Sequence, residues 1–462
     1  MKKLFLVTDS TANKVSYYHI MLLLLSLPFD RFYSHLILIS LALHTLIQLK
    51  KQDIKPLFTF NNLILQSVFF VTVAGTLYTI NKTQAFNEWA RQIVILLMPI
   101  ILCLNPISLK KYRDNFLTVF ALGCTASIIY LFAQVLLTIR YYHFPISAML
   151  SPAFTNHNFS APFDIHATFF SMQIAIALVY LLYALIRQSP GLNTKILYIF
   201  CCAILAAGII QLSSKSVFVS LLLIINIAIP YFLLTGKFRV KYISVAAALS
   251  ILVIAGIFSI DTFKDHYVYD LKKDLSKASD NELSDPRLAR WGLAMKLVAQ
   301  SPVIGHGSGS EIQLLKEHYF ENKFYRSYLH GLNAHNQYIS FLIKTGIWGL
   351  LIYLATLFFA FRLAMTRKDL LLFSFLAIVA IVSFSENVLD VDKGTFFYAI
   401  FFSLFVFAGY EGGRVISTGN TEIRRLLQSQ ISYIFFYKQV APLEPSMKFV
   451  LLFFIPLGIP CL

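Results

Sequence analysis

The chain has 462 residues with a formal charge of +16, and 57% of its residues are apolar while 13% are charged. Together with a mean hydropathy of +0.68, this composition excludes an ordinary soluble domain and indicates a polytopic membrane protein. The five cysteines all fall in apolar runs, and no group of residues has metal-ligand spacing, so we expect no disulfide framework, no metal and no cofactor.

Uncharged runs recur along the whole chain, and each is long enough to form a membrane-spanning helix of about 15 to 25 residues. The first run leads directly into the second without a small-residue cleavage site, so we expect it to be retained. The pattern predicts an all-α protein with about twelve transmembrane helices. Their expected limits are 15–29, 31–49, 60–80, 89–104, 115–139, 163–187, 195–212, 216–235, 242–260, 336–361, 370–388 and 395–410.

The basic residues predict the orientation of these helices. With the N-terminus in the cytoplasm, 22 of the 39 Lys and Arg residues fall in cytoplasmic loops or in the C-terminal tail, as the positive-inside rule requires. The positive charge is therefore a topology signal, and we expect membrane lipids but no nucleic acid as partners.

One long loop separates the ninth and tenth spans on the outer side. It holds ten basic and ten acidic residues, so its net charge is close to zero. The predicted organisation is transmembrane helices one to nine in residues 1–260, a periplasmic loop in 261–334, transmembrane helices ten to twelve in 335–410, and a cytoplasmic tail in 411–462. The tail ends in a short apolar segment, either an interfacial anchor or a thirteenth span.

The second half of the long loop predicts an amphipathic helix. "DPRLARWGLAMKLVAQSP" places Asp285 as N-cap and Pro286 at the first helical position, and the helix should end before Ser301. Its apolar stripe suits a helix lying on the outer membrane face, and a glycine-rich turn follows it. The stripe consists of Leu288, Trp291, Met295 and Val298, and the turn contains Gly305, Gly307 and Gly309.

The tenth span begins with "NAHNQYISFLIKTGIWGLL". At about 100° per residue, His335, Gly346 and Gly349 share one stripe of the helix. We expect the two glycines to let this helix press against a neighbour, which fixes the angle at which His335 is presented. Asn336 is expected to cap the helix or to orient His335.

Charged residues near the outer helix ends predict structural ion pairs. Glu386, Asp390 and Asp392 follow the eleventh span, and we expect them to pair with the cations of this region, although they could also bind sugar hydroxyls. Lys344 lies inside the tenth span and should be buried against a polar partner or snorkel to the interface.

This ordered set of motifs resembles the O-antigen ligase and O-antigen polymerase family, from about residue 211 to 410. The first half resembles the family mainly by its number of spans. The residues that carry the resemblance are Arg287 and Trp291, the segment 302–309, His335 and Asn336 with Gly346 and Gly349, Lys215 in "QLSSKSVFVSLLL", and His166 in "FDIHATFFS". Lys215 stands where the family has Arg, which keeps the charge but loses the bidentate fork.

The resemblance implies a GT-C-like enzyme of the bacterial inner membrane with its active site on the periplasmic side. It would transfer a glycan from an undecaprenyl-pyrophosphate-linked donor without a metal. The acceptor would be a lipid A-core sugar, as in O-antigen ligases, or a second lipid-linked repeat unit, as in the polymerases, and we favour the ligase. His335 would act as general base.

The other family positions would bind the substrates. Arg287, Arg290 and Lys215 would hold the pyrophosphate, and the supporting residues would be Asn336, Trp291, His166, Gly346 and Gly349.

A secondary transporter is the alternative from a different class, because twelve spans are common among transporters. A transporter predicts polar or Gly/Pro-broken helices at mid-membrane. In the two-halves transporter fold, a long cytoplasmic loop is also expected after the sixth span. Here that loop, "RQSPGLNTK", is short, and the long loop lies outside. The sequence therefore favours the transferase.

Overall fold

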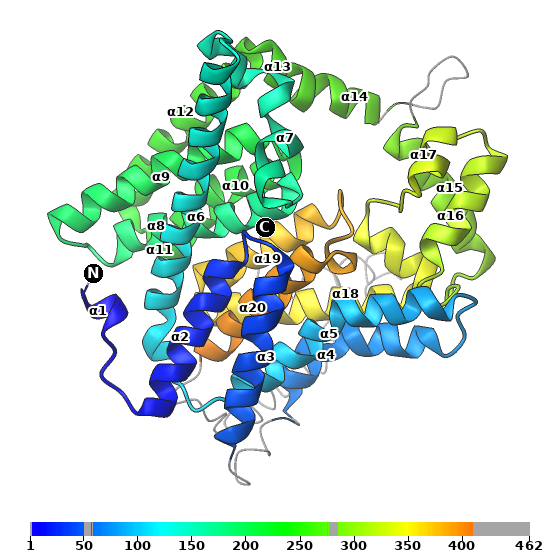
Figure 1. The fold of residues 1–462 in the computed structure, drawn as a ribbon, viewed down its shortest axis with the longest axis horizontal. Helices are drawn as coiled ribbons and strands as arrows, with labels where there is room; N and C mark the ends of the chain where they lie inside the picture. Colours follow the sequence, from blue (N-terminus) through cyan, green and yellow to red (C-terminus); the bar gives the residue numbers. More distant parts are fainter. Residues whose placement is uncertain (1, 50–56, 58, 275, 277–284, 410–462) are drawn as a thin grey trace, which may run out of the picture. The chain divides into compact units, whose positions relative to one another are not determined.

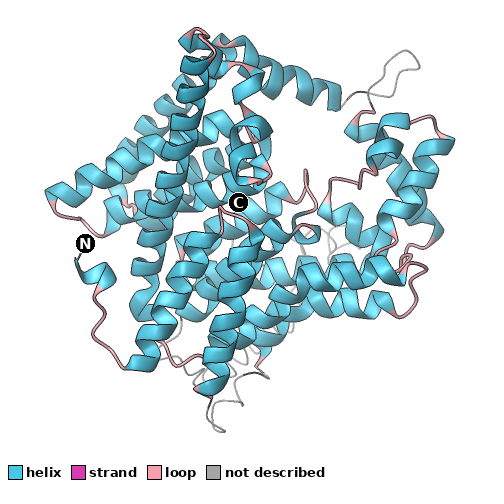
Figure 2. Ribbon diagram, viewed as in Figure 1, coloured by secondary structure: helices cyan, strands magenta, loops and turns pink. Residues whose placement is uncertain are grey.

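The computed structural model describes the chain except for residues 1, 50–56, 58, 275, 277–284 and 410–462. Within the described part the protein is all-helical (Figure 2), which confirms the predicted fold class. The tail predicted at 411–462 lies outside the described residues, as do residues 277–284 of the predicted periplasmic loop.

Each of the twelve predicted spans coincides with a helix or with a short run of helices. Seven described helices are long and apolar enough to cross a membrane, so the polytopic character is confirmed, while the number twelve stays a prediction. The helices are α2 (Thr11–Ser26), α3 (Arg31–Ile47), α4 (Phe60–Thr76), α5 (Lys82–Leu104), α6 (Leu109–Tyr141), α8 (Ala167–Arg187), α9 (Leu192–Leu212), α10 (Lys215–Leu223) continued by a π-turn into α11 (Ile229–Leu233), α12 (Gly236–Ser259), α18 (Gln337–Arg367), α19 (Leu370–Val382) and α20 (Asp392–Ala408).

Short helices connect these elements. They are α1 (Lys2–Phe5), α7 (Asn156–Ser160), α13 (Asp261–Lys264), α14 (Asp270–Asp274), α15 (Arg287–Gln300), α16 (Glu311–Glu321) and α17 (Tyr325–His330). The last three lie together at one edge of the ribbon (Figure 1).

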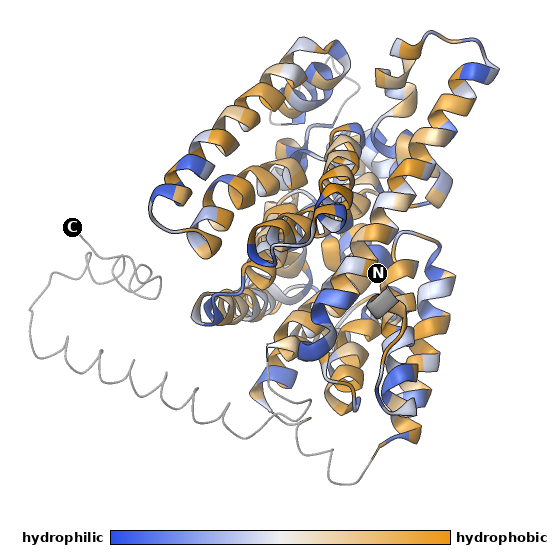
Figure 3. Cartoon of the chain, turned by 90° about the vertical axis from the view of Figure 1, so that its left-hand side faces the viewer, coloured by the Kyte–Doolittle hydropathy of each residue, from blue (hydrophilic) through white to orange (hydrophobic). Residues whose placement is uncertain are grey.

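The centre of the helical assembly is aromatic. α20 is buried from Gly394 to Ala408, and its phenylalanine rings contact one another and Phe375 of α19 in tilted pairs. At the other extreme, α12 buries only Ala246 and Ile257 among its described residues. Apolar residues occur along most of the described helices (Figure 3), and many of the large ones are exposed. Such a surface suits contact with lipid.

α15 forms where the sequence predicts a helix, but two details differ. The N-cap position is Pro286, while Asp285 instead accepts the backbone N–H of Ser327 at 2.7 Å. The predicted apolar stripe is also divided, since Leu288 and Met295 are exposed while Val298 is buried; its contact with the outer membrane face stays a prediction. α15 packs on α16 and α18 through a different face, because these neighbours form a second hydrophobic core with it. That core contains Leu293, Ala294, Leu297, Val298, Leu315, Tyr319, Ala334 and Ile343.

The glycine-rich turn and the glycines of α18 form one structural unit. α18 is not a smooth helix, because Gly346 adopts φ 62° and ψ −157° and breaks it. In an unbroken helix the Ile343 carbonyl would accept from Ile347. Here the carbonyls of Ile343 and Lys344 instead accept the N–H groups of His306 and Gly307, both at 2.8 Å, while Ile347 donates to Pro302 at 2.9 Å.

The break requires glycine on both sides. A Cβ at Gly346 would lie 2.3 Å from the Val303 carbonyl oxygen, and one at Gly305 would lie 2.6 Å from the Gly346 nitrogen. Both residues have positive φ, which side chains disfavour. The turn also holds α4, because Ser308 donates to the Thr72 carbonyl at 2.7 Å and to the Gly75 carbonyl at 3.1 Å. Gly346 therefore packs against a loop. The prediction that it would pack against a neighbouring helix is wrong for this residue.

Candidate active site around His335

His335 lies just before α18 and not on it. Its backbone is left-handed, with φ 47°, so the helical stripe that the sequence predicted does not include it. Asn336 is the N-cap, and its side chain accepts the N–H groups of Tyr338 at 3.0 Å and Ile339 at 3.1 Å. The predicted capping role of Asn336 is confirmed by this geometry.

Three side-chain oxygens hold the backbone around His335. The N–H of Ala334 donates to Glu311 at 2.9 Å, that of His335 to Asn333 at 3.0 Å, and that of Asn336 to Asn387 at 2.8 Å. A left-handed non-glycine residue costs on the order of 1–2 kcal/mol. The three hydrogen bonds offset this cost and fix the backbone position from which the imidazole extends.

The imidazole of His335 pairs with Glu386, which follows α19. Nδ1 of His335 lies 3.2 Å from Oε2 of Glu386. A carboxylate on Nδ1 fixes the tautomer with the proton on that nitrogen and leaves Nε2 to accept a proton. The His335 side chain is 26% exposed and that of Glu386 only 11%, so the imidazole is accessible while its partner is covered.

Glu386 is kept charged by its neighbours. Burial alone would raise its pKa, but the hydrogen bond from His335 and the charges of His335, His166 and Arg287 outweigh burial and hold the pKa below its ordinary value. An ionised carboxylate at this position can stabilise the imidazolium that forms when His335 takes a proton.

Arg287 reaches the same carboxylate from the start of α15. Its Nη1 donates to the Ser385 carbonyl at 3.0 Å, Nη2 lies 3.9 Å from Oε1 of Glu386, and Nε lies 3.5 Å from Oδ2 of Asp274. One turn later, Trp291 donates from its indole to the Ala334 carbonyl at 2.8 Å. Through Arg287 and Trp291, α15 therefore contacts both Glu386 and the backbone next to His335.

His166 belongs to this group through its electrostatics. It is the N-cap of α8, where its Nδ1 accepts the Thr168 N–H at 3.3 Å, and its ring meets that of His157 edge-on at 4.1 Å between centroids. Burial lowers the pKa of His166 to about 4, with Glu386 opposing and His157, His335 and Arg287 reinforcing the shift. His166 is therefore neutral near pH 7.

The remaining predicted cations separate. Lys215, the first residue of α10, lies close enough to Arg287 and Asp274 for their charges to act on its ammonium. Arg290 is buried beside Tyr319, and its Nε and Nη1 have no hydrogen-bond partner among the described residues. Arg290 thus lies in the α15–α16 core, whereas Arg287 lies beside Glu386.

The two glycines of α18 lie away from His335. Gly346 forms the helix break, and a Cβ at Gly349 would meet Val71 of α4 at 3.3 Å. Sequence reasoning missed two members of the group. Glu386 was predicted to pair with a cation but not to contact His335, and His157 was not singled out. The partners lie far apart along the chain, and no spacing reveals their contact.

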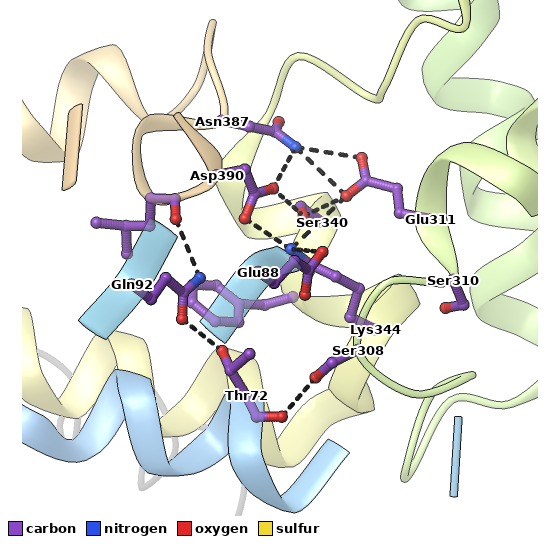
Figure 4. Close-up of polar contacts among 12 residues, drawn as sticks. Thr72, Glu88, Gln92, Ser308, Ser310, Glu311, Ser340, Lys344, Asn387 and Asp390 are labelled. Atoms are coloured by element: carbon purple, nitrogen blue, oxygen red, sulfur yellow. Dashed lines mark hydrogen bonds and ion pairs between the residues drawn. The ribbon is translucent and has the colours of Figure 1, made fainter. Parts of the chain in front are cut away.

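A second polar group, drawn in Figure 4, holds the His335 segment through Glu311 and Asn387. The ammonium of Lys344 is 2.8 Å from Asp390, 3.3 Å from Glu88 and 4.0 Å from Glu311. Ser340 donates to Glu311 and Asn387 donates to Asp390. We call these residues the Lys344 cluster: Glu88, Glu311, Ser340, Lys344, Asn387 and Asp390. It confirms that Lys344 is buried against polar partners.

The comparison with known families covers the centre of this arrangement. Residues 200–354 match the family model described as O-Antigen ligase, and no curated protein matches the chain. The matched segment runs from α9 through the break in α18 and includes Lys215, Arg287 and His335, while Glu386 lies beyond it. The resemblance seen in the sequence is therefore confirmed over residues 200–354, where this multi-pass membrane protein is similar to the O-antigen ligase family.

Proposed function

We propose that this protein is an O-antigen ligase of the bacterial inner membrane, with its site on the periplasmic side. It transfers a glycan from undecaprenyl pyrophosphate to a sugar hydroxyl of lipid A-core. The observation that carries the proposal is the shared carboxylate of Glu386, which has the His335 imidazole at 3.2 Å on one oxygen and the Arg287 guanidinium at 3.9 Å on the other. A base and a cation for the leaving group are thereby held together.

His335 acts as the general base. The acceptor hydroxyl passes its proton to Nε2 of His335 while its oxygen bonds to the anomeric carbon of the donor. The bond from that carbon to the pyrophosphate oxygen breaks, and its electron pair leaves with undecaprenyl pyrophosphate. Glu386 stabilises the imidazolium, which later releases its proton to water.

Arg287 stabilises the negative charge that develops on the pyrophosphate. Its contacts to Glu386 and Asp274, at 3.9 and 3.5 Å, are ion pairs longer than normal hydrogen bonds. A pyrophosphate oxygen can therefore replace them at small cost. Lys215 adds a second positive charge nearby. Since side chains supply the cations, the mechanism needs no metal, and chelators should leave the rate unchanged.

The test uses purified protein with labelled lipid-linked repeat units. Product that forms only when lipid A-core is added supports the ligase. A ladder of longer lipid-linked chains formed without lipid A-core would instead assign a polymerase. Consumption that depends on an ion gradient, without a new glycosidic bond, would indicate transport and contradict the proposal. The His335→Ala variant serves as the negative control in each arm.

A further inference from the structure

A cavity adjoins the His335 site. It has a volume of about 770 Å³ and lies between the first half of α5, α16 and the segment that follows Asp390. Gln84, Glu88 and Arg91 of α5 face Gln313 and Lys316 of α16 across it. Neither His335 nor Arg287, Glu386 or Lys215 is part of its lining.

The cavity and the base are connected through Asn333. Asn333 lines the cavity, and its side-chain oxygen also accepts the backbone N–H of His335 at 3.0 Å. Only Ala334 separates the two residues along the chain. A ligand in the cavity can therefore extend a group towards the imidazole.

The lining suits a neutral, hydroxyl-rich ligand. Five carboxylates and three cationic side chains border the cavity, together with amides of Asn and Gln. Since three of these carboxylates also surround the Lys344 ammonium, the lining as a whole is close to neutral, which favours a neutral ligand over a pyrophosphate. Few aliphatic side chains line the cavity, which disfavours a lipid tail. Sugar hydroxyls both donate and accept hydrogen bonds, which suits a lining that combines carboxylates, cations and amides.

One buried oxygen in this lining has no partner. Oε1 of Glu88 pairs with Lys344 at 3.3 Å, but Oε2 is buried without a hydrogen-bond partner among the described residues. Buried acceptors are normally satisfied, so this oxygen suits a donor from a ligand. The Lys344 ammonium already lies among the carboxylates, so a hydroxyl fits better than another cation.

We infer that this cavity binds a neutral saccharide portion of a glycan substrate. The inference rests on the proposed function, because it takes the glycan as a reactant of the His335 site. The saccharide belongs either to the acceptor or to the donor, and both present the same hydroxyl chemistry.

Direct binding tests the inference without catalysis. The probes are the delipidated core oligosaccharide and the repeat-unit oligosaccharide released from its lipid by mild acid. Each is added to the purified full chain, and binding is measured by saturation-transfer NMR. Because Glu88→Gln replaces the unpartnered carboxylate with an amide, it should weaken binding roughly tenfold or more. Gln84→Ala should weaken it about threefold.

The matched control is Thr83→Ala, an exposed neighbour on α5 outside the cavity lining, which should bind like the wild type. If Glu88→Gln does not fold, Gln84→Ala still decides. The inference is overturned if neither glycan binds the wild type, or if the folded variants at Glu88 and Gln84 bind like Thr83→Ala.

Kinetics then identify the source of the saccharide. A higher KM for lipid A-core in Gln84→Ala assigns the acceptor, and a higher KM for the lipid-linked donor assigns the donor. A change confined to kcat contradicts the inference. His335→Ala should still bind the oligosaccharide while it loses transfer. Binding with normal transfer in His335→Ala would refute the mechanism but leave the cavity assignment intact.

Discussion

His335 and Lys344 lie nine residues apart in the sequence. The His335–Glu386 pair and the Lys344 cluster nevertheless differ in how many partners the charged group has and in how exposed it is. His335 has one carboxylate partner and an accessible ring, whereas Lys344 is 4% exposed and has three carboxylates around it. A charge with one partner can take part in proton transfer. A buried charge with several partners costs much to disturb and is suited to hold a structure.

The two groups are also connected. Glu311 belongs to the Lys344 cluster and accepts the N–H of Ala334, while Asn387 donates into the cluster and accepts the N–H of Asn336. The closed cluster thus fixes the backbone on both sides of the open histidine. We conclude that the Lys344 cluster holds the backbone beside His335 in place, while the imidazole ring stays accessible.

The largest effect on glycan transfer is expected at the His335–Glu386 pair. His335→Ala should lower the chemical step by about 10² to 10⁴, the usual contribution of a positioned base. Donor binding should survive because the cations remain. Single-turnover transfer with pre-bound donor measures the step. A wild-type single-turnover rate would exclude His335 as the base.

Arg287→Ala should come next, with transfer reduced by about 10² while protein level holds, because the leaving group loses its nearest cation. Arg287→Lys should recover only part of this, since a point charge lacks the planar fork. Lys215→Arg is the companion variant and should be tolerated or improved. Full activity in Arg287→Ala would move the pyrophosphate role to Lys215 or Arg290.

Lys344→Met tests the closed cluster and should act on stability. Removing the cation leaves three buried carboxylates together, which costs about 3–5 kcal/mol. The melting temperature in detergent should fall markedly. The matched control is Arg31→Met, whose ion pair with Asp392 is 69% exposed on the arginine side and should contribute at most about 1 kcal/mol. Equal losses in the two variants would contradict the structural role of Lys344.

Much of the fold could be predicted from the sequence because lipid imposes a simple rule. Every span that was predicted from an apolar run coincides with a described helix, and the family spacing singled out His335, Arg287 and Trp291. Local signals also worked for Asn336, whose capping depends only on the next three residues.

The contacts that make the site could not be predicted, because they join distant segments. Glu386 meets His335 across 51 residues, and Glu88 meets Lys344 across 256. The prediction for Gly346 failed for a related reason. Helical periodicity assumes an unbroken helix, but the loop at 302–308 supplies hydrogen bonds that make a break favourable.

The smallest expected effect is the pH response of His166, at the edge of the open group. Burial lowers its folded-state pKa to about 4, while the unfolded side chain titrates near 6.5. Between these values the unfolded chain binds more protons, so stability falls as the pH drops from 6.5 towards 4. His166→Gln removes this proton uptake, so its melting temperature should fall less than that of the wild type between pH 7 and pH 5. If His166→Gln and the wild type lose the same stability between these pH values, His166 is not held neutral by the fold.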